Sequence, residues 1–297
     1  MNALALCVPA RVLPVLLVAL QWAAGQAKAK ENVVGSGEKV AFLGDSITAQ
    51  GWGNPAGYVR LIVAGLKANG IEIDVAPAGI GSHKSNDMLA RFDRDVLSKQ
   101  PQWMTLSCGV YDVAQDEKGV PLDDEQAAAK PYLKTNPSEP DKGTFKKNIA
   151  QIVEKAQAGG IKVMLLTATP IGEDLKGAKN QKLAAYNDFL CQLAREKHAL
   201  IADLNALFQQ RIKMANEPGK NVCTVDGIHM NAEGNKLMAT GVLETFGLDA
   251  AQIKKAQEAW KPLEAQAEEE AKVVAAAKAK AAAEKAAEEK PSLPGAK

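Results

Sequence analysis

Short apolar runs alternate with helix-periodic stretches from residue 38 to about residue 248. The apolar runs predict strands at Val40–Leu43, Ile71–Ala76, Trp103–Cys108, Lys162–Thr167 and Leu200–Asp203. The intervening stretches place apolar residues at helical spacing near 56–68, 85–99, 144–158, 178–197, 204–214 and 231–246. Such alternation predicts an α/β domain over 38–248, with a five-stranded parallel sheet between two helical layers.

Two segments depart from this rhythm. Residues 113–143 are polar and rich in proline, which is long for a connection inside a compact domain. This loop insertion begins just past a strand, so it is expected either as a lid over the site or as a surface excursion. Residues 250–297 are dominated by Ala, Glu and Lys, which favour helix but provide no wide apolar stripe. We expect a helical or disordered tail there, with a partner that the sequence does not identify.

The N-terminus has the pattern of a signal peptide. Arg11 precedes the apolar stretch Val12–Leu20, and small residues follow in Ala23–Ala27. Such a core is short for a bilayer span, so we expect residues 1–27 to be cleaved and the protein to be secreted or periplasmic. An uncleaved anchor is the alternative.

Composition narrows the classes of partner. The chain of 297 residues carries a formal net charge of +1, which gives no electrostatic argument for binding nucleic acid. Cys108, Cys191 and Cys223 would remain after cleavage, and an odd number argues against a disulfide framework. Cys108 lies in an apolar run and is expected to be a small buried residue.

The first chemically informative stretch follows the first predicted strand. Gly44, Asp45 and Ser46 come directly after Val40–Leu43 and precede a helix. Open α/β sheets keep their sites at this carboxyl edge, and a helix N-terminus there can hold an anion. Capping of the helix by Asp45 or Ser46 is the plainer alternative.

The second informative stretch pairs a carboxylate with an imidazole. Asp226 and His229 are three residues apart, and Gly227 eases the turn that would let them meet. A carboxylate on one imidazole nitrogen leaves the other free to act as a base for a serine hydroxyl. His198 is expected to be structural, and His83 has no carboxylate spaced to orient it. A metal held by Asp45, Asp226 and His229 is the weaker alternative, because no further ligand spacing supports it.

Together these stretches make the chain resemble the GDSL, or SGNH, family of serine hydrolases over about residues 38–247. Gly44-Asp45-Ser46 matches the first sequence block, Pro77-Ala78-Gly79 stands at the second, and Asp226 with His229 matches the last. The resemblance implies a flavodoxin-like sheet, with Ser46 as nucleophile and with Asp226 and His229 as its triad partners. It also implies that the N–H groups of Ser46 and Gly79 bind the oxyanion.

The third block departs from the family pattern. The family has Gly-x-Asn-Asp, and this chain has Gly109-Val110-Tyr111-Asp112. Tyr111 therefore stands where the family's asparagine donates to the oxyanion, and a phenol can also donate. The tyrosine leaves three outcomes open: a substitute donor, a slower enzyme, or a site that only binds.

We expect a secreted serine esterase that needs no cofactor or metal and acts on a small-molecule or polysaccharide ester, with acetyl esters on polysaccharides favoured. The alternatives are a lipid esterase or lysophospholipase, and a degenerate member that binds a glycan without turnover. No stable membrane span is expected once the signal is cleaved.

Overall fold

The computed structural model describes residues 33–129, 143–217 and 219–288. Within them, five parallel strands form one sheet in the order β2-β1-β3-β4-β5. The strands are β1 (Lys39–Gly44), β2 (Asp74–Gly79), β3 (Trp103–Ser107), β4 (Lys162–Leu166) and β5 (Leu200–Ala202). The α/β fold class predicted from the sequence is confirmed. The expected signal peptide lies outside the described residues.

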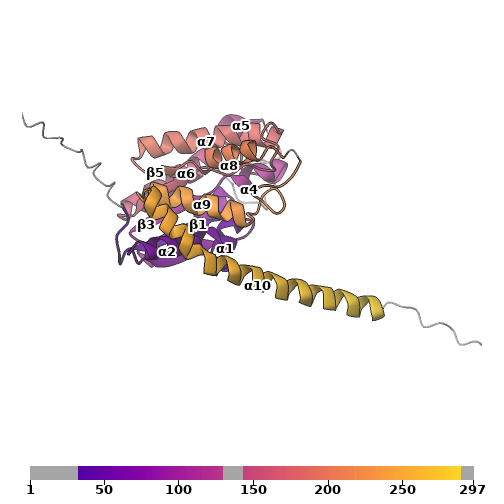
Figure 1. The fold of residues 1–297 in the computed structure, drawn as a ribbon. Helices are drawn as coiled ribbons and strands as arrows, with labels where there is room; N and C mark the ends of the chain where they lie inside the picture. Colours follow the sequence, from indigo (N-terminus) through magenta and orange to yellow (C-terminus); the bar gives the residue numbers. More distant parts are fainter. Residues whose placement is uncertain (1–32, 130–142, 218, 289–297) are drawn as a thin grey trace, which may run out of the picture.

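Helices cover both faces of the sheet (Figure 1). One layer holds the helices α2 (Tyr58–Ala68), α8 (Leu204–Ala215), α9 (Ala232–Thr245) and α10 (Ala250–Glu288). It has α2 and α9 at its centre, with α8 and α10 packed against them. The other layer holds α3 (Ser85–Asp95), α6 (Phe145–Ala158) and α7 (Ala178–Glu196). Shorter elements complete the chain: α1 (Ser46–Gly53), η1 (Leu97–Lys99), α4 (Val110–Ala114), η2 (Asp116–Lys118) and α5 (Asp124–Ala128).

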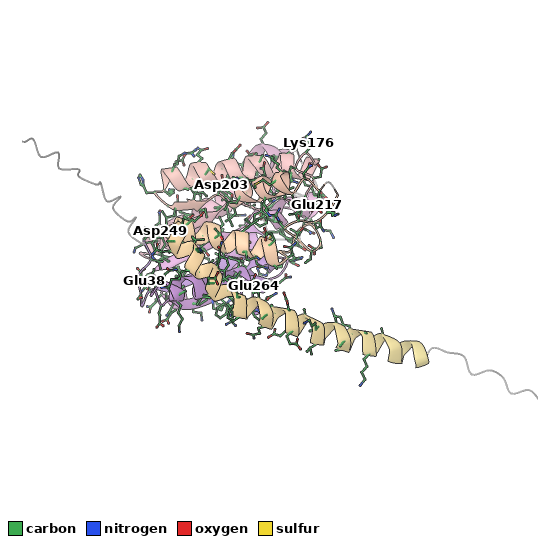
Figure 2. The ribbon with its side chains drawn as sticks, viewed as in Figure 1. Glu38, Lys176, Asp203, Glu217, Asp249 and Glu264 are labelled. Carbon is green, nitrogen blue, oxygen red and sulfur yellow. The ribbon has the colours of Figure 1, made fainter. Side chains whose placement is uncertain are left out.

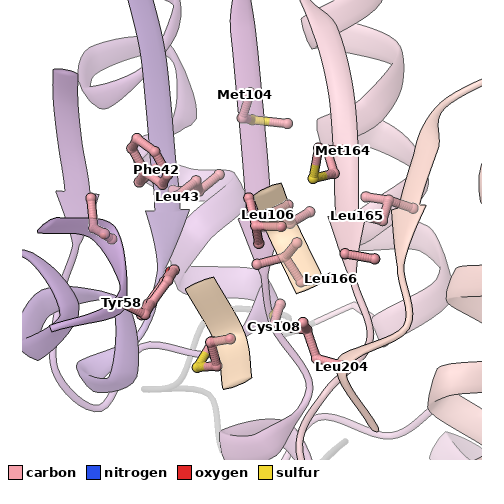
Figure 3. Packing of buried hydrophobic residues seen from close by; sticks show 14 of the residues in the cluster. Phe42, Leu43, Tyr58, Met104, Leu106, Cys108, Met164, Leu165, Leu166 and Leu204 are labelled. Carbon is pink, nitrogen blue, oxygen red and sulfur yellow. The ribbon is translucent and has the colours of Figure 1, made fainter. Parts of the chain in front are cut away.

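The central strands form the core. Val40, Ala41, Phe42 and Leu43 of β1 are fully buried, as expected for a strand with helices on both faces. Figure 3 shows Phe42 and Leu43 beside residues of β3 and β4, including Met104, Leu106 and Leu165. This packing fixes the carboxyl end of β1, where Ser46 begins α1. Cys108 is buried as predicted, and Cys108, Cys191 and Cys223 are free thiols.

The second strand begins later than the sequence pattern suggested. We expected Ile71–Ala76, but β2 covers Asp74–Gly79. Gly70 has φ +80°, and the N–H of Ile71 donates to the carbonyl of Leu66. Ile71 therefore completes the end of α2, because a left-handed glycine and a bond back to the last turn terminate helices.

The loop insertion is partly built into the domain. Val120 and Leu122 are buried, and the hydroxyl of Tyr186 donates to the carbonyl of Val120 at 2.8 Å. The N–H of Phe145 donates to the carbonyl of Pro121 at 2.8 Å. Residues 130–142, which the lid hypothesis also concerns, lie outside the described residues.

The helical tail begins inside the folded body. Ile253, Ala256 and Trp260 of α10 are buried, and the indole N–H of Trp260 donates to the carbonyl of Leu61 at 2.8 Å. Lys236 of α9 pairs with Glu264 at 3.1 Å, close to where α10 leaves the body (Figure 2). Beyond this pair α10 projects outward (Figure 1). No helix among the described residues combines the length and hydrophobicity that a membrane crossing requires.

Trp260 should therefore contribute to the stability of the whole domain. Trp260→Ala is expected to lower the free energy of unfolding by about 3–5 kcal/mol, because it leaves a large cavity between α10 and α2. Urea unfolding followed by far-UV circular dichroism measures the change. Val273→Ala, on the same helix but 60% exposed, is the control and should change stability by less than about 0.5 kcal/mol. If Trp260→Ala lowered the free energy of unfolding as little as the control does, the packing of α10 against α2 would be contradicted.

Candidate active site

Ser46 lies at the carboxyl edge of the sheet, as the first residue of α1. The carboxylate of Asp45 caps this helix and accepts a hydrogen bond from the N–H of Ile47 at 2.8 Å. The capping alternative is thus correct for Asp45, and it leaves the Ser46 hydroxyl free for another partner. First-turn N–H groups of a helix have no acceptor within the helix, so the same turn can also bind an anion.

The Ser46 hydroxyl meets an imidazole from the far end of the domain. Its Oγ lies 2.9 Å from Nε2 of His229, although 183 positions separate the two residues. On the other side of the ring, Nδ1 of His229 lies 2.7 Å from Oδ2 of Asp226. The three side chains form one continuous chain of hydrogen bonds, in the arrangement that activates a serine hydroxyl.

Asp226 is ionised in this arrangement. Partial burial opposes the charge, but hydrogen bonds from the His229 ring and from the N–H groups of His229 and Ile228 outweigh it, and the pKa of Asp226 falls to about 2. With a carboxylate on Nδ1, that nitrogen carries the proton and Nε2 can accept from Ser46. Asp45 is used differently: it is buried, burial raises its pKa to about 7, and its side chain caps α1, whereas Asp226 contacts Nδ1 of His229.

Gly79 lies where α1 crosses the end of β2. A Cβ there would come within 2.3 Å of the backbone N of Ala49 and 2.6 Å of the carbonyl carbon of Thr48. Close packing of helix on strand therefore requires glycine at this position. The oxyanion role expected for Gly79 stays a prediction. The following loop also borders the site, since a Cβ on Gly81 would lie 3.9 Å from that of Ser46.

Tyr111 reaches this same loop. Its hydroxyl donates to Oγ of Ser82 at 3.3 Å, and Ser82 adopts a left-handed backbone with φ 65°. The next residue, Asp112, is fully buried and accepts from the N–H and the hydroxyl of Ser85 at 3.0 and 2.6 Å. The Gly-x-Tyr-Asp block thus joins the starts of α3 and α4 and aims its phenol at the loop beside Ser46.

The other two histidines do not join the hydrogen-bond chain of Ser46. Nδ1 of His83 accepts from Nε of Arg91 at 3.0 Å; burial and then the charge of Arg91 lower the pKa of His83. His198 adopts φ 52° between α7 and β5. Among the described residues, no cluster of three or more histidine, cysteine or acidic side chains is placed to hold a metal ion.

Sequence reasoning gave no role to two charged residues beside the site. Arg91 is 5% exposed and donates to the carbonyls of Ala78 at 2.8 Å and Gly44 at 2.9 Å, so it joins the ends of β1 and β2. Glu173 follows β4 and accepts hydrogen bonds from the loop that carries Asp226 and His229. Neither has a spacing signal in the sequence, since each acts on a segment distant along the chain.

Both the sequence and the fold are similar to those of known ester hydrolases. The model of the GDSL-like lipase/acylhydrolase family matches residues 42–237. An acetylxylan esterase of Geobacillus stearothermophilus is 27% identical over 235 residues, which cover 73% of this chain and 97% of that protein. Its crystal structure superposes with a TM-score of 0.60 at 23% identity, with the same coverage of both chains.

Two further sets of solved structures are similar. The acetyl xylan esterase AlAXEase is 30% identical, covers 69% of this chain and 98% of its own, and gives a TM-score of 0.57. Other structures of the Geobacillus enzyme are described as catalytic mutants in which a serine, an aspartate or a histidine is replaced by alanine. The family match covers more than half of the chain. The chain therefore belongs to the GDSL-like lipase/acylhydrolase family and is an ester-bond hydrolase.

Proposed function

We propose that this protein is an exported serine esterase that removes acetyl groups from a polysaccharide. The observation that carries the proposal is the hydrogen-bond chain from Oγ of Ser46 through the His229 ring to Asp226, with distances of 2.9 and 2.7 Å. The relatives named acetylxylan esterase support the acetyl group and the glycan. The apolar stretch after Arg11 supports export.

In the proposed reaction, Oγ of Ser46 attacks the acetyl carbonyl while Nε2 of His229 takes its proton. Asp226 holds the imidazole in the required tautomer and stabilises the imidazolium. The tetrahedral intermediate collapses as His229 returns the proton to the departing sugar hydroxyl. Water then attacks the acetyl-serine by the same route, which releases acetate and restores the free hydroxyl.

The oxyanion would form beside the first turn of α1. The N–H of Ser46 is a donor there, and the proposal also assigns Gly79 and Tyr111 as donors, with the Tyr111 hydroxyl turning from Ser82 to the oxyanion. Such donors act on charge that develops only in the transition state, so their loss lowers kcat and leaves KM nearly unchanged.

Tyr111 provides a direct test of this part. Tyr111→Phe keeps the ring and removes the hydroxyl, and is expected to lower kcat for 4-nitrophenyl acetate by about 10²-fold. Tyr111→Asn introduces the residue usual in the family, and it too should lower turnover if the phenol is the working donor. Initial rates over a range of substrate concentrations separate kcat from KM. Wild-type kcat in Tyr111→Phe would contradict a donor role.

Release of acetate tests the substrate class. The purified protein should liberate acetate from acetylated xylooligosaccharides and acetylated xylan, with Ser46→Ala as the blank. No fatty acid above that blank should come from lysophosphatidylcholine. Release of fatty acid without acetate would favour the lipid esterase alternative, which the same Ser46 chemistry could perform.

A further inference from the structure

The loop that carries Asp226 and His229 has little regular structure of its own. Between α8 and α9 its only strand-like pairing within the described residues is a single bridge from Thr224 to Met230. The side chains of Asp226 and His229 are 51% and 26% exposed, so hydrophobic packing alone holds neither of them firmly. Hydrogen bonds within the loop and contacts from elsewhere in the fold together keep the imidazole at Ser46.

From outside the loop, the carboxylate of Glu173 accepts four hydrogen bonds. One carboxylate oxygen accepts from the N–H of Val222 at 2.5 Å, and the other accepts from the N–H groups of Cys223 and Thr224 at 2.8 and 3.0 Å. The hydroxyl of Thr224 also donates to this second oxygen at 3.0 Å. Three successive backbone N–H groups thus converge on one anion, as they do in the nests that bind anionic ligands.

Thr224 carries this attachment to the residues beside the triad. While its hydroxyl donates to Glu173, it accepts from the N–H of Gly227 at 3.1 Å. The carbonyl of Gly227 in turn accepts from the N–H of Gly172 at 2.6 Å. Gly227 has φ +86° and follows Asp226 directly. The turn between Asp226 and His229 is therefore held through both the N–H of Gly227, by way of Thr224 and Glu173, and its carbonyl, by Gly172.

We propose that Glu173 is a positioning residue that holds the Asp226–His229 loop so that Nε2 of His229 reaches the Ser46 hydroxyl. This inference rests on the proposed function, because it assigns His229 the role of base. Glu173 touches no reacting atom and acts only through the loop. A displacement of about 1 Å at the reacting groups can cost on the order of 10²-fold in rate, so loosening this loop should be visible in turnover.

Glu173→Gln tests the proposal with little change in size. The amide keeps one acceptor oxygen but directs an NH₂ donor at backbone N–H donors, so part of the attachment is lost. We expect kcat for 4-nitrophenyl acetate to fall by about 10–100-fold with KM within about twofold of wild type. Glu154→Gln, an exposed glutamate on α6 paired with Lys197, is the matched control and should retain wild-type kcat.

A second pair of variants separates positioning from folding. Thr224→Val removes the hydroxyl between Glu173 and Gly227 and should lower kcat by about tenfold. Thr224→Ser retains the hydroxyl and should stay within about twofold of wild type. All variants are assayed well below the thermal transition that each shows by circular dichroism. The proposal would be overturned if the fall in kcat of Glu173→Gln were no larger than the fraction of that variant that is unfolded. Wild-type kcat in the folded variant would overturn it as well.

Chemical modification tests whether Glu173 holds the His229 imidazole in place, with a readout that does not depend on catalysis. Diethyl pyrocarbonate acylates accessible imidazole nitrogens, and mass spectrometry compares the rate at His229 with that at His198 in the same sample. Loosening the loop should speed modification of His229 in Glu173→Gln by more than about threefold. An unchanged ratio would refute the positioning role even in an inactive protein. Absence of ester hydrolysis in the wild-type protein would instead refute the proposed function.

Discussion

Replacing Ser46 with alanine is expected to lower kcat for acetyl ester hydrolysis by about 10⁴–10⁶-fold. The change removes the only atom that forms the covalent intermediate in the proposed reaction, and residual rates come from the oxyanion donors and substrate binding alone. Because Ser46 is only half-buried, losing its Oγ should leave the fold intact. Steady-state kinetics with 4-nitrophenyl acetate and with an acetylated xylooligosaccharide measure the loss.

Ser98→Ala is the matched control for that variant. Ser98 lies on η1, and its hydroxyl donates to the carbonyl of Arg94 on the exposed surface. Its replacement should leave kcat within about twofold of wild type, since the change is distant from the reacting groups. Activity in Ser46→Ala comparable to that of Ser98→Ala would show that another group carries out the reaction.

Replacing His229 with alanine is expected to reduce kcat by a similar 10⁴–10⁶-fold, since members of a triad act as one unit. Among the residues that the structure describes, His229 is the base that hydrogen-bonds to the Ser46 hydroxyl, whose own acidity is too low for attack at neutral pH. Combining both substitutions should reduce kcat little further than either one alone. Kinetics of the two single variants and the double variant measure this non-additivity.

His198→Asn is the control for the histidine. Asparagine tolerates the left-handed backbone at this position, where φ is 52°, so the fold should be preserved. Its activity should equal that of the wild type. Losses that multiply in the Ser46→Ala, His229→Ala double variant would contradict a shared mechanism, because they would mean that the two side chains act independently.

The parts of the site that the sequence predicted are those with a short-range signal. Gly44-Asp45-Ser46 follows a run of four buried apolar residues, so strand, turn and helix could be inferred together. Asp226 and His229 lie within one turn of the chain, and their separation alone suggested that they meet. Parallel strands end at the same edge of a sheet, and open α/β sheets keep their sites at that edge, which favoured a shared location for the two segments.

Other features had no such local signal. Glu173 and Arg91 act on backbone groups of distant segments, and a lone charged residue in a sequence is ordinarily a solvated one. The strand was predicted to start too early because Ile71 and Ile73 continue its apolar pattern. In the structure, Gly70 has a left-handed backbone and the N–H of Ile71 bonds back to the last turn of α2. Close packing of Gly79 against Ala49 likewise depends on a crossing of helix and strand that spacing cannot reveal.

The C-terminal segment shows a third kind of limit. The sequence left a helical and a disordered tail open, and in the structure α10 extends to Glu288. Composition did not reveal that Ile253, Ala256 and Trp260 bury one face of its first turns against α2, because the many Ala, Glu and Lys residues of 250–297 obscure so short a stripe. A short apolar stripe at the start of a polar helix is the signal that would have identified this docking.

The central claim is that the Ser46 hydroxyl is made nucleophilic by the imidazole of His229, 2.9 Å away. The most direct test treats the full-length protein with a fluorophosphonate and maps the adduct by peptide mass spectrometry. We predict one adduct per chain, on Ser46, and a labelling rate at least about 10³-fold lower in His229→Ala. An adduct on another residue, or equal labelling of Ser46 in the two proteins, would contradict the account.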